Sequence, residues 1–446
     1  MEPGDGRCPR AATAAVLVAL FTLSWAAASI AALEPLRPGH QVYVLRVSGF
    51  RLAGAFCTLA GPVYVGSPPG SGNGSLVLLP YRGLVVPGFR VSASCASGRL
   101  VVLAGSYHGR PALALVDPLA ASARLVTPSD PALWGRFSTV ACSAGRIAAA
   151  GLANGRVLVA AGPTGEAFGG SGWVAGTLDV PGRPRFSLAS GNTSYVLLYD
   201  GSVIAFNGSG AALLEPRAAG EAKLYPRGLT LGPGGPWLYG RARLSNSSWG
   251  FIAPLAGGEG YLVRSKTHGG AVLAASWVGG RWLLYYRPGS YWDSILESTP
   301  AGGFDGVRLL WKGEHSVETI APAQGGFDTG TVVLSGWRVV IACFRGLREA
   351  SYWLGGEPVA HVTLIPHPES IETSRLRLAS PRVEHAGLSR VEVELRPLEL
   401  RPYEGEWQWL GEAEAKWWGP LYAASFAGLG IVFFALALRG FGCARW

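Results

Sequence analysis

The sequence lacks the short motifs that mark the commonest classes of hydrolase and nucleotide-binding enzyme. It contains no H-E-x-x-H, no G-x-S-x-G and no G-x-x-x-x-G-K-[ST], which removes the zinc-protease helix, the nucleophile elbow and the phosphate loop. The seven His are scattered, and the six Cys include no C-x-x-C pair. We therefore expect no metal site and no cofactor, and the catalytic residues, if there are any, are unknown.

Asn, Gln, Met and Lys are scarce. The 446 residues include five Asn, three Gln, one Met and four Lys, against 34 Arg. This composition resembles that of a thermophile's proteins, although a GC-rich genome gives the same Arg bias. Four of the five Asn lie in N-x-Ser/Thr sequons, at Asn73, Asn192, Asn207 and Asn246. We expect glycosylation of an archaeal cell-surface protein; the alternative is that Asn-Gly-Ser is turn chemistry.

Long apolar runs are missing from the middle of the chain and occur only at its ends. Residues 11–33 and 417–438 carry no charge, and each is long enough to cross a bilayer as a helix, which takes about 20 residues. The first run follows two Arg and contains three consecutive Ala, at 26–28. Residues 1–33 are thus expected to be a signal peptide, with an uncleaved N-terminal anchor as the alternative.

The second run is expected to be a transmembrane helix over 417–438. It is followed by Arg439 and Arg445, and the positive-inside rule places the tail 439–446 in the cytoplasm. The bulk of the chain then lies on the extracellular side of the cell membrane. Within this helix Ala424 and Gly428 form a small-xxx-small pair, which permits close helix packing.

A sequence motif is repeated through the middle of the chain. "CASGRLVVLAG" (95–105) recurs as "CSAGRIAAAG" (142–151), and further copies are "CTLAGPVYVG" (57–66), "LASGNTSYVLLY" (188–199), "LGPGGPWLYG" (231–240), "SWVGGRWLLYY" (276–286) and "APAQGGFDTGTVVLSG" (321–336). The copies consist of short apolar runs between Gly-rich turns, which fit strands and are too short for helices. A spacing of about 40 to 50 residues is typical of β-propeller blades. We predict an all-β propeller over 34–350 with about seven blades, six or eight remaining open.

Residues 41–49, "QVYVLRVSG", are expected to close this ring by pairing into the last blade. The segments "YVLLYDGSVIAFNGSG" (195–210) and "NGRVLVAAGPTGE" (154–166) resemble the repeats of quinoprotein-like β-propellers. The resemblance implies the fold. Quinoprotein dehydrogenases hold a metal and a quinone at the ring centre, and no carboxylate set or vicinal Cys pair matches that site here, so catalysis does not follow.

Four cysteines lie between the apolar runs. Cys57, Cys95 and Cys142 occupy matching repeat positions, and neighbouring blades are packed sheets about 10 Å apart. That distance exceeds the reach of a disulfide, so we expect the three to be small buried core residues. A disulfide between Cys57 and Cys343 across the ring closure is the exception that we consider.

After about residue 350 the composition changes. Gly becomes rare, and Val391, Val393 and Leu395 alternate with charged residues, a pattern that indicates a half-exposed strand. We predict a small β-sandwich or β-rich stalk over 351–416. Residues 357–416 hold eleven Glu and seven Arg or Lys, a balance of −4, which leaves about +11 on 34–356. A basic head favours an anionic partner, such as an acidic glycan or a surface protein, rather than nucleic acid.

One aromatic cluster is a candidate ligand platform. "RWLLYYRPGSYWD" (281–293) gathers Trp282, Tyr285, Tyr286, Tyr291 and Trp292. Aromatic side chains near a loop stack on sugar rings, but they are more often part of a core.

These observations favour a membrane-anchored extracellular propeller that acts as a binding or scaffold protein for a protein or glycan. The alternatives are a membrane-tethered propeller enzyme of glycosidase, lyase or quinoprotein type, and an accessory subunit of a membrane transport or secretion complex.

Overall fold

The structure is a computed structural model. It describes residues 16, 18–20, 22–23, 41–46, 51–58, 61–67, 74–79, 82–143, 145–164, 172–207, 209–265, 269–278, 280–288, 292–299, 302–312, 316–322, 329–335, 338–344, 361–368, 371–404, 408–413, 424–425, 427–432 and 435.

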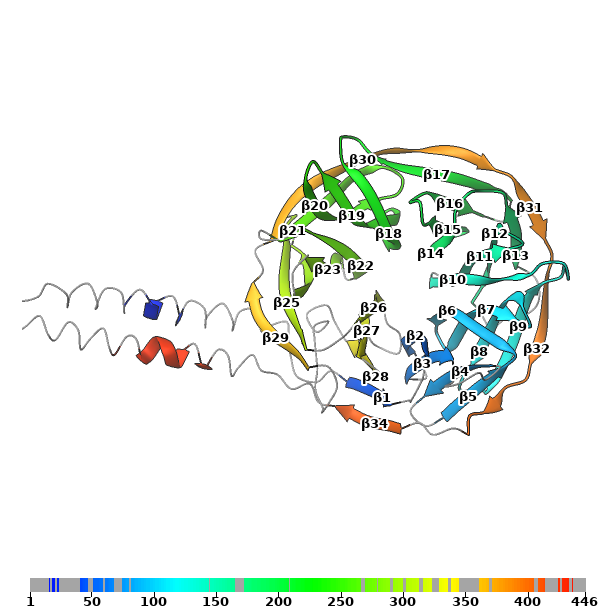
Figure 1. Ribbon diagram of the computed structural model, residues 1–446, viewed down its shortest axis with the longest axis horizontal. Coiled ribbons are helices and arrows are strands. Elements are labelled where there is room, and N and C mark those ends of the chain that lie inside the picture. Colours follow the sequence, from blue (N-terminus) through cyan, green and yellow to red (C-terminus); the bar gives the residue numbers. More distant parts are fainter. Residues whose placement is uncertain are drawn as a thin grey trace, which may run out of the picture.

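The chain forms successive groups of four antiparallel strands, and Figure 1 shows these groups arranged as a ring. The described residues contain seven such groups, which we number as blades in chain order. Blade 1 is β2(Arg51–Thr58), β3(Gly61–Ser67), β4(Gly74–Leu79) and β5(Arg82–Pro87); blade 2 is β6(Phe89–Ser97), β7(Leu100–Tyr107), β8(Arg110–Asp117) and β9(Ser122–Pro128); blade 3 is β10(Gly135–Ser143), β11(Arg146–Ala153), β12(Arg156–Pro163) and β13(Val174–Leu178). Blade 4 is β14(Pro184–Ser190), β15(Thr193–Leu198), β16(Val203–Phe206) and β17(Ala211–Ala218); blade 5 is β18(Lys223–Gly232), β19(Gly235–Leu244), β20(Ser247–Pro254) and β21(Gly258–Ser265); blade 6 is β22(Gly270–Val278), β23(Arg281–Pro288), β24(Trp292–Ser298) and β25(Phe304–Lys312).

Blade 7 is assembled from both ends of the propeller. Its strands are β26(Ser316–Pro322), β27(Thr329–Ser335), β28(Arg338–Phe344) and β1(Gln41–Arg46). β1 is antiparallel to β28, with Gln41 opposite Cys343 and Arg46 opposite Arg338. The expectation that residues 41–49 pair into the last blade is confirmed for Gln41–Arg46, and the fold is a β-propeller.

The repeated sequence produces the buried middle of each blade. In blade 2, all but one of the side chains of β7 and all but one of those of β8 are buried, because both faces of the sheet pack against neighbouring blades. The turn between the first two strands of a blade holds a glycine with positive φ, as at Gly98 and Gly145. A side chain disfavours that conformation, which explains why Gly recurs at these positions.

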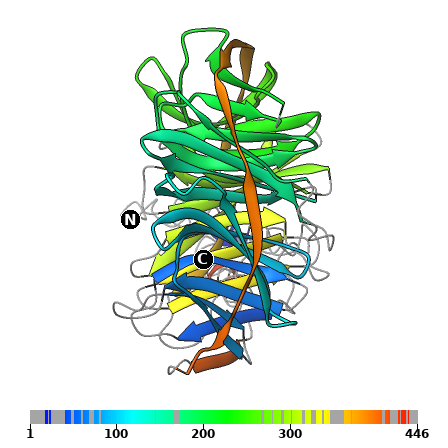
Figure 2. The ribbon, with the colours of Figure 1, turned by 90° about the vertical axis from the view of Figure 1, so that its right-hand side faces the viewer.

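The segment after residue 360 does not form a separate domain, so the prediction of a sandwich or stalk over 351–416 is wrong. Its strands are β29(His361–Pro368), β30(Ile371–Ala386), β31(Leu388–Val391), β32(Val393–Leu398), β33(Arg401–Pro402) and β34(Gln408–Ala413). Each pairs antiparallel with the outermost strand of a blade: β29 with β25, β30 with β21 and β17, β31 with β13, β32 with β9, β33 with β5, and β34 with β1. We call this segment the belt. It runs around the ring against the order of the blades, and Figure 2 shows it crossing their outer edges.

There is a physical reason for the belt to cover the outer edges of the blades. The fourth strand of a blade would otherwise present unpaired backbone groups to solvent, as every edge strand does. The belt satisfies those groups while burying few side chains: of the sixteen residues of β30, only Leu376 and Leu378 are buried. The alternation seen in the sequence is real, since Val391, Val393 and Leu395 pack against the core between blades 2 and 3.

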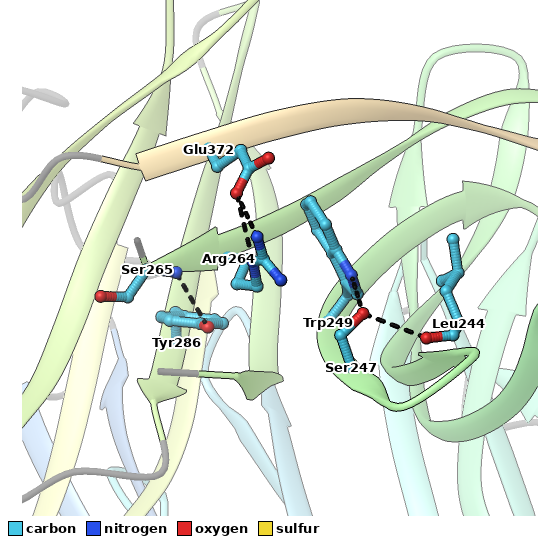
Figure 3. Close-up of polar contacts among 7 residues, drawn as sticks. All are labelled: Leu244, Ser247, Trp249, Arg264, Ser265, Tyr286 and Glu372. Carbon is cyan, nitrogen blue, oxygen red and sulfur yellow. Dashed lines mark hydrogen bonds and ion pairs between the residues drawn. The ribbon is translucent and has the colours of Figure 1, made fainter. Parts of the chain in front are cut away.

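Side-chain contacts also fasten the belt, as Figure 3 shows. Arg264 on β21 donates two hydrogen bonds, from Nε at 3.2 Å and Nη2 at 2.6 Å, to one carboxylate oxygen of Glu372 on β30. The Arg264 guanidinium lies 4.4 Å from the ring centre of Trp249, whose indole N–H donates to Ser247. Arg264 is thereby held between an aromatic ring and the belt carboxylate.

The two apolar runs lie mostly outside the described residues. The described parts of 11–33 (16, 18–20 and 22–23) and of 417–438 (424–425, 427–432 and 435) are helical. Among the residues that the structure describes, no helix is long and apolar enough to cross a membrane.

Candidate functional site: an arginine-rich rim

A β-bulge recurs in the first strand of every blade. The register shifts at one residue near the start of β2, β6, β10, β14, β18, β22 and β26. The extra residues are Ala53, Ser92, Ser138, Arg185, Arg227, Leu273 and Glu318. Bulges bend the strand and change the direction of local side chains, and blades 4 and 5 place arginines at this position.

Glycine lies opposite the bulge in several blades. A Cβ on Gly105 would lie 1.9 Å from the carbonyl oxygen of Arg90, and one on Gly151 would lie 2.0 Å from that of Arg136. Each of these glycines is the last residue of a copy of the repeated motif, in "VVLAG" and "IAAAG". The repeat therefore encodes the close approach that the bulged first strand needs.

All first strands begin at one end of the ring, which we call the linker rim because the loops between blades lie there. The opposite end, with the turns between first and second strands, is the turn rim. Arg90, Arg136 and Arg183 are exposed on the linker rim, at or just before the start of β6, β10 and β14. In the described part of the chain, none of the three has a carboxylate within ion-pair distance.

Two bulge arginines meet at the junction of blades 4 and 5. Arg185 donates from Nη1 to the carbonyl oxygen of Pro226 at 3.1 Å, which ties β14 to β18. Its guanidinium also lies 5.4 Å from the ring centre of Tyr199, a side chain that is 66% exposed. Arg227, the extra residue of β18, directly follows Pro226 and is exposed.

Below them lies a buried tyrosine. Gly228 has no room for a side chain, because a Cβ there would lie 2.2 Å from the hydroxyl oxygen of Tyr239. Burial raises the pKa of Tyr239, while the positive charges of Arg227 and Arg185 oppose that rise. The hydroxyl of Tyr239 is thus neutral at physiological pH, and the two guanidinium charges lie close above the core.

A second stacked group adjoins this junction. The ring of Tyr225 lies 4.9 Å from the guanidinium of Arg241 and 5.6 Å from the ammonium of Lys223. Tyr225 is directly opposite Arg241 in the sheet, and Lys223 is opposite Arg243. We call the set Arg183, Arg185, Lys223, Arg227, Arg241 and Arg243, with Tyr199 and Tyr225, the arginine site.

Carboxylates near the arginine site are fewer than its cations. Asp179, Asp200 and Glu221 lie on the same loops and are exposed. Asp200 accepts hydrogen bonds from the backbone N–H and the hydroxyl of Ser202, so it stabilises its own turn. Six cations against three carboxylates leave a positive surface on which guanidinium forks and aromatic faces are exposed together. Such a surface binds anions, because guanidinium pairs with carboxylate in a bidentate geometry.

The linker rim continues at blades 2 and 3. Trp134 is 60% exposed, and a Cβ on Gly109 would lie 2.7 Å from its ring. Asn154 fixes this loop: its side chain accepts from the backbone N–H of Trp134 at 3.1 Å and donates to the carbonyl of Ala132 at 2.9 Å. The one Asn outside a sequon is therefore structural.

The predicted aromatic platform is not a binding surface in its described part. Tyr285 and Tyr286 are 0% exposed and Trp282 is 2% exposed, because β23 lies inside blade 6. Trp282 packs on Trp237 of blade 5 and on Trp277, with ring centres 4.8 and 5.0 Å apart. The side chains of Tyr291 and Trp292 lie outside the described residues.

The cysteine prediction is also wrong for one pair. Cys95 and Cys142 form a disulfide between β6 and β10, with their Cα atoms 5.6 Å apart. The spacing of about 10 Å applies to packed sheets, but the first strands of neighbouring blades converge toward the ring axis. The side chains of Cys57 and Cys343 lie outside the described residues, so a disulfide between them stays a prediction.

Three of the four predicted glycosylation sites are described. Asn192, Asn207 and Asn246 are exposed and lie in or beside the turns between strands of blades 4 and 5. The Asn207 side chain accepts from the backbone N–H groups of Ser209 and Gly210, which forms a local turn. Asn73 lies outside the described residues. Glycosylation stays a prediction at all four.

No group of three or more His, Cys, Asp and Glu suitable for a metal ion occurs among the described residues. Sequence reasoning missed the arginine site and the other arginines of the linker rim, although a signal was present for those of blades 1 to 3. Arg51, Arg90 and Arg136 each precede the repeat cysteine by five or six residues. That spacing places them at the same end of consecutive blades.

Comparisons with known proteins add little to this description. No protein-family model matches the chain, and no curated protein matches it. The chain is similar to the solved structure of YCF48 bound to D1 peptide, with 14% sequence identity and a TM-score of 0.35, over 68% of this chain and 97% of that chain. The assignment of the fold rests on the strand order described above.

Proposed function

We propose that this protein is a binding protein whose arginine site captures a carboxylate-rich segment of a partner. The observation that carries the proposal is the junction of blades 4 and 5. There the bulges of adjacent first strands bring Arg185, which lies beside exposed Tyr199, onto the carbonyl of Pro226, the residue before Arg227. A rigid, repeated scaffold with an adaptable basic rim suits recognition rather than covalent chemistry.

Two further features support the proposal. The segment that contains the belt has an acidic excess, with eleven Glu against seven Arg or Lys in 357–416. Because these carboxylates belong to the segment at the outer edge, the blades themselves carry the positive excess of the chain. Charged groups arranged in this way steer an anionic partner to the rim and weaken with added salt.

The test compares two double variants with the same change in charge, in the full-length protein. R185Q/R227Q alters the arginine site, and R375Q/R382Q alters two exposed belt residues. Binding of a poly-glutamate peptide and of an oligouronate is measured at low and physiological salt. We expect at least a tenfold loss for R185Q/R227Q, since a hydrogen bond to a charged group contributes about 1.5–3 kcal/mol, and less than a twofold loss for R375Q/R382Q.

Equal losses in the two variants would contradict the proposal, because they would show that net charge alone attracts the ligand. Binding of the peptide but not of the oligouronate identifies a protein partner, and the reverse identifies an acidic glycan. Unchanged thermal unfolding of R185Q/R227Q confirms that the site, not the fold, was altered.

We further propose that the propeller is displayed on the extracellular side of a cell membrane. The uncharged runs 11–33 and 417–438, the basic tail after 438 and the four sequons support this location. Protease treatment of intact cells should then cleave the propeller, and a glycosidase should shift its mass. Protection of the propeller until the cells are lysed would contradict the location.

A further inference from the structure

The propeller brings the two ends of the chain to one place. β1, the first strand after the N-terminal run, is antiparallel to β34, the last strand before the C-terminal run. Val42 lies opposite Ala413. The first apolar run ends eight residues before β1, and the second begins four residues after β34. Two segments more than 380 residues apart in sequence therefore leave the same edge of blade 7.

The described parts of the two runs are in contact. A Cβ on Gly430 would lie 2.8 Å from Cγ of Leu23 and 3.0 Å from the hydroxyl oxygen of Thr22. Ala19 is 1% exposed, and Gly430 is buried. The Thr22 hydroxyl donates within its own helix, to the carbonyl oxygen of Val18 or Ala19. The absence of a side chain at Gly430 thus allows Thr22 and Leu23 to approach closely, and the hydroxyl group at the contact is hydrogen-bonded.

Large apolar residues face away from this contact. Val18, Leu20, Leu429, Ile431 and Val432 are 40–66% exposed. A pair of helices in water buries its large apolar side chains and exposes small or polar ones. The reverse arrangement is favourable where the surroundings are lipid, because acyl chains cover the large side chains and small residues allow close backbone approach.

The heights of the two runs also match. Thr22 lies at the centre of the run 11–33, and Gly430 lies near the centre of 417–438. In an ideal antiparallel pair of helices that touch at these two residues, sequence position 33 would be level with 419 and position 11 with 441. The ends of the two runs then agree within about 5 Å at a rise of 1.5 Å per residue, so one bilayer would cover both.

We propose that the first apolar segment is retained in the mature protein and pairs with the second as an antiparallel two-helix anchor in the lipid bilayer. Thr22 and Leu23 pack on Gly430 at its centre. This arrangement would put Arg7 and Arg10, which precede the first run, on the same side of the bilayer as Arg439 and Arg445, which follow the second, as the positive-inside rule requires. This inference does not depend on the ligand of the arginine site.

Cysteine crosslinking in native membranes tests the proposed pairing directly. In a full-length chain carrying C8S and C443S, the pair T22C/G430C is compared with T22C/I431C, whose second residue is adjacent and faces outward. We expect oxidation to link the first pair at least fivefold more efficiently than the second. Mass spectrometry of the extracted protein should find peptides from residues 11–33, and alkaline extraction should leave the chain in the membrane.

Three outcomes would overturn the inference. A mature chain that begins after Ala28 means that the first segment is a cleaved signal peptide. Equal or absent crosslinking of the two pairs means that Gly430 does not face Thr22. Release by alkaline extraction means that the pair is not embedded in lipid.

Discussion

The inner and outer edges of the blades are closed in different ways. At the inner edge, specific contacts join successive first strands: Ser94 donates to the Ala53 carbonyl, Cys95 is linked to Cys142, and Thr139 bonds Ser187 at 2.6 Å. At the outer edge, one continuous segment pairs with every blade by backbone hydrogen bonds. The inner edge is held together by side chains of the blades themselves. The outer edge is covered by the belt, a segment that belongs to none of the blades.

The two edges therefore contribute differently to stability and to the geometry of the arginine site. Close inner packing fixes the bulges, and with them the arginines of the linker rim. The belt protects exposed edges and can vary in side chains, since most of those on β30 face solvent. We expect substitutions at the inner edge to disrupt the whole ring and substitutions in the belt to act locally.

The largest effect should come from filling the space opposite a bulge. G105V and G151V each force a side chain against a backbone carbonyl that lies within 2.0 Å of the ideal Cβ. Backbone cannot move away without breaking the first strand, so we expect losses above about 4 kcal/mol and little soluble protein. The matched control is G220V, where nothing lies within 4 Å of the added Cβ. The variants are compared by soluble yield and thermal unfolding. A G105V protein as stable as G220V would contradict the conclusion that the residue opposite the bulge must be glycine.

Next come the two leucines that anchor the belt. L376A and L378A each remove a buried side chain from the core shared by blades 4 and 5. We expect a loss of about 2–5 kcal/mol apiece, with faster hydrogen exchange confined to 371–386 and its partner strands. V383A, at a belt position that is 58% exposed, should change stability by less than about 0.5 kcal/mol. Loss of protection throughout the ring would show that the belt and the blades unfold together.

The same contrast explains what the sequence could predict. Each blade repeats its turn glycines, its apolar strands and the close-packed Gly, so the propeller and its ring closure follow from pattern and spacing. The alternation of Val391, Val393 and Leu395 correctly predicted a half-exposed strand. Alternation shows which face of a strand meets solvent but not which edge it joins, and the belt's partners carry no matching pattern. The belt was therefore mistaken for a stalk.

The disulfide offers a covalent test of the inner edge. C95A/C142A opens a loop with a sequence separation of 47 residues, and the chain-entropy estimate for such a loop is roughly 4 kcal/mol as an upper value. We expect a loss of about 2–4 kcal/mol with unchanged hydrogen exchange in the belt. Reductant should lower the stability of the wild type by more than it lowers that of the variant. If reductant destabilises both equally, other disulfides contribute.

The smallest effect concerns the turn rim. Burial of Asp117 raises its pKa, but the hydrogen bond from Arg99, the backbone N–H groups of Ala120 and Leu119 and the Arg99 charge outweigh burial, so the pKa of Asp117 lies below its ordinary value of 3.8. A carboxyl with a lowered folded-state pKa stabilises the fold above the unfolded-state value. That stabilisation is lost as the pH falls from about 4 through the lowered folded-state value.

D117N should therefore reduce stability by about 1 kcal/mol at neutral pH and remove part of the wild type's decline in acid. D200N is the matched control, because Asp200 also caps a turn but its side chain is hydrogen-bonded to Ser202 rather than to an arginine. Unfolding measured from pH 7 to pH 2.5 decides, and a D117N curve parallel to the wild type would show that the Arg99 pair contributes nothing to the turn rim.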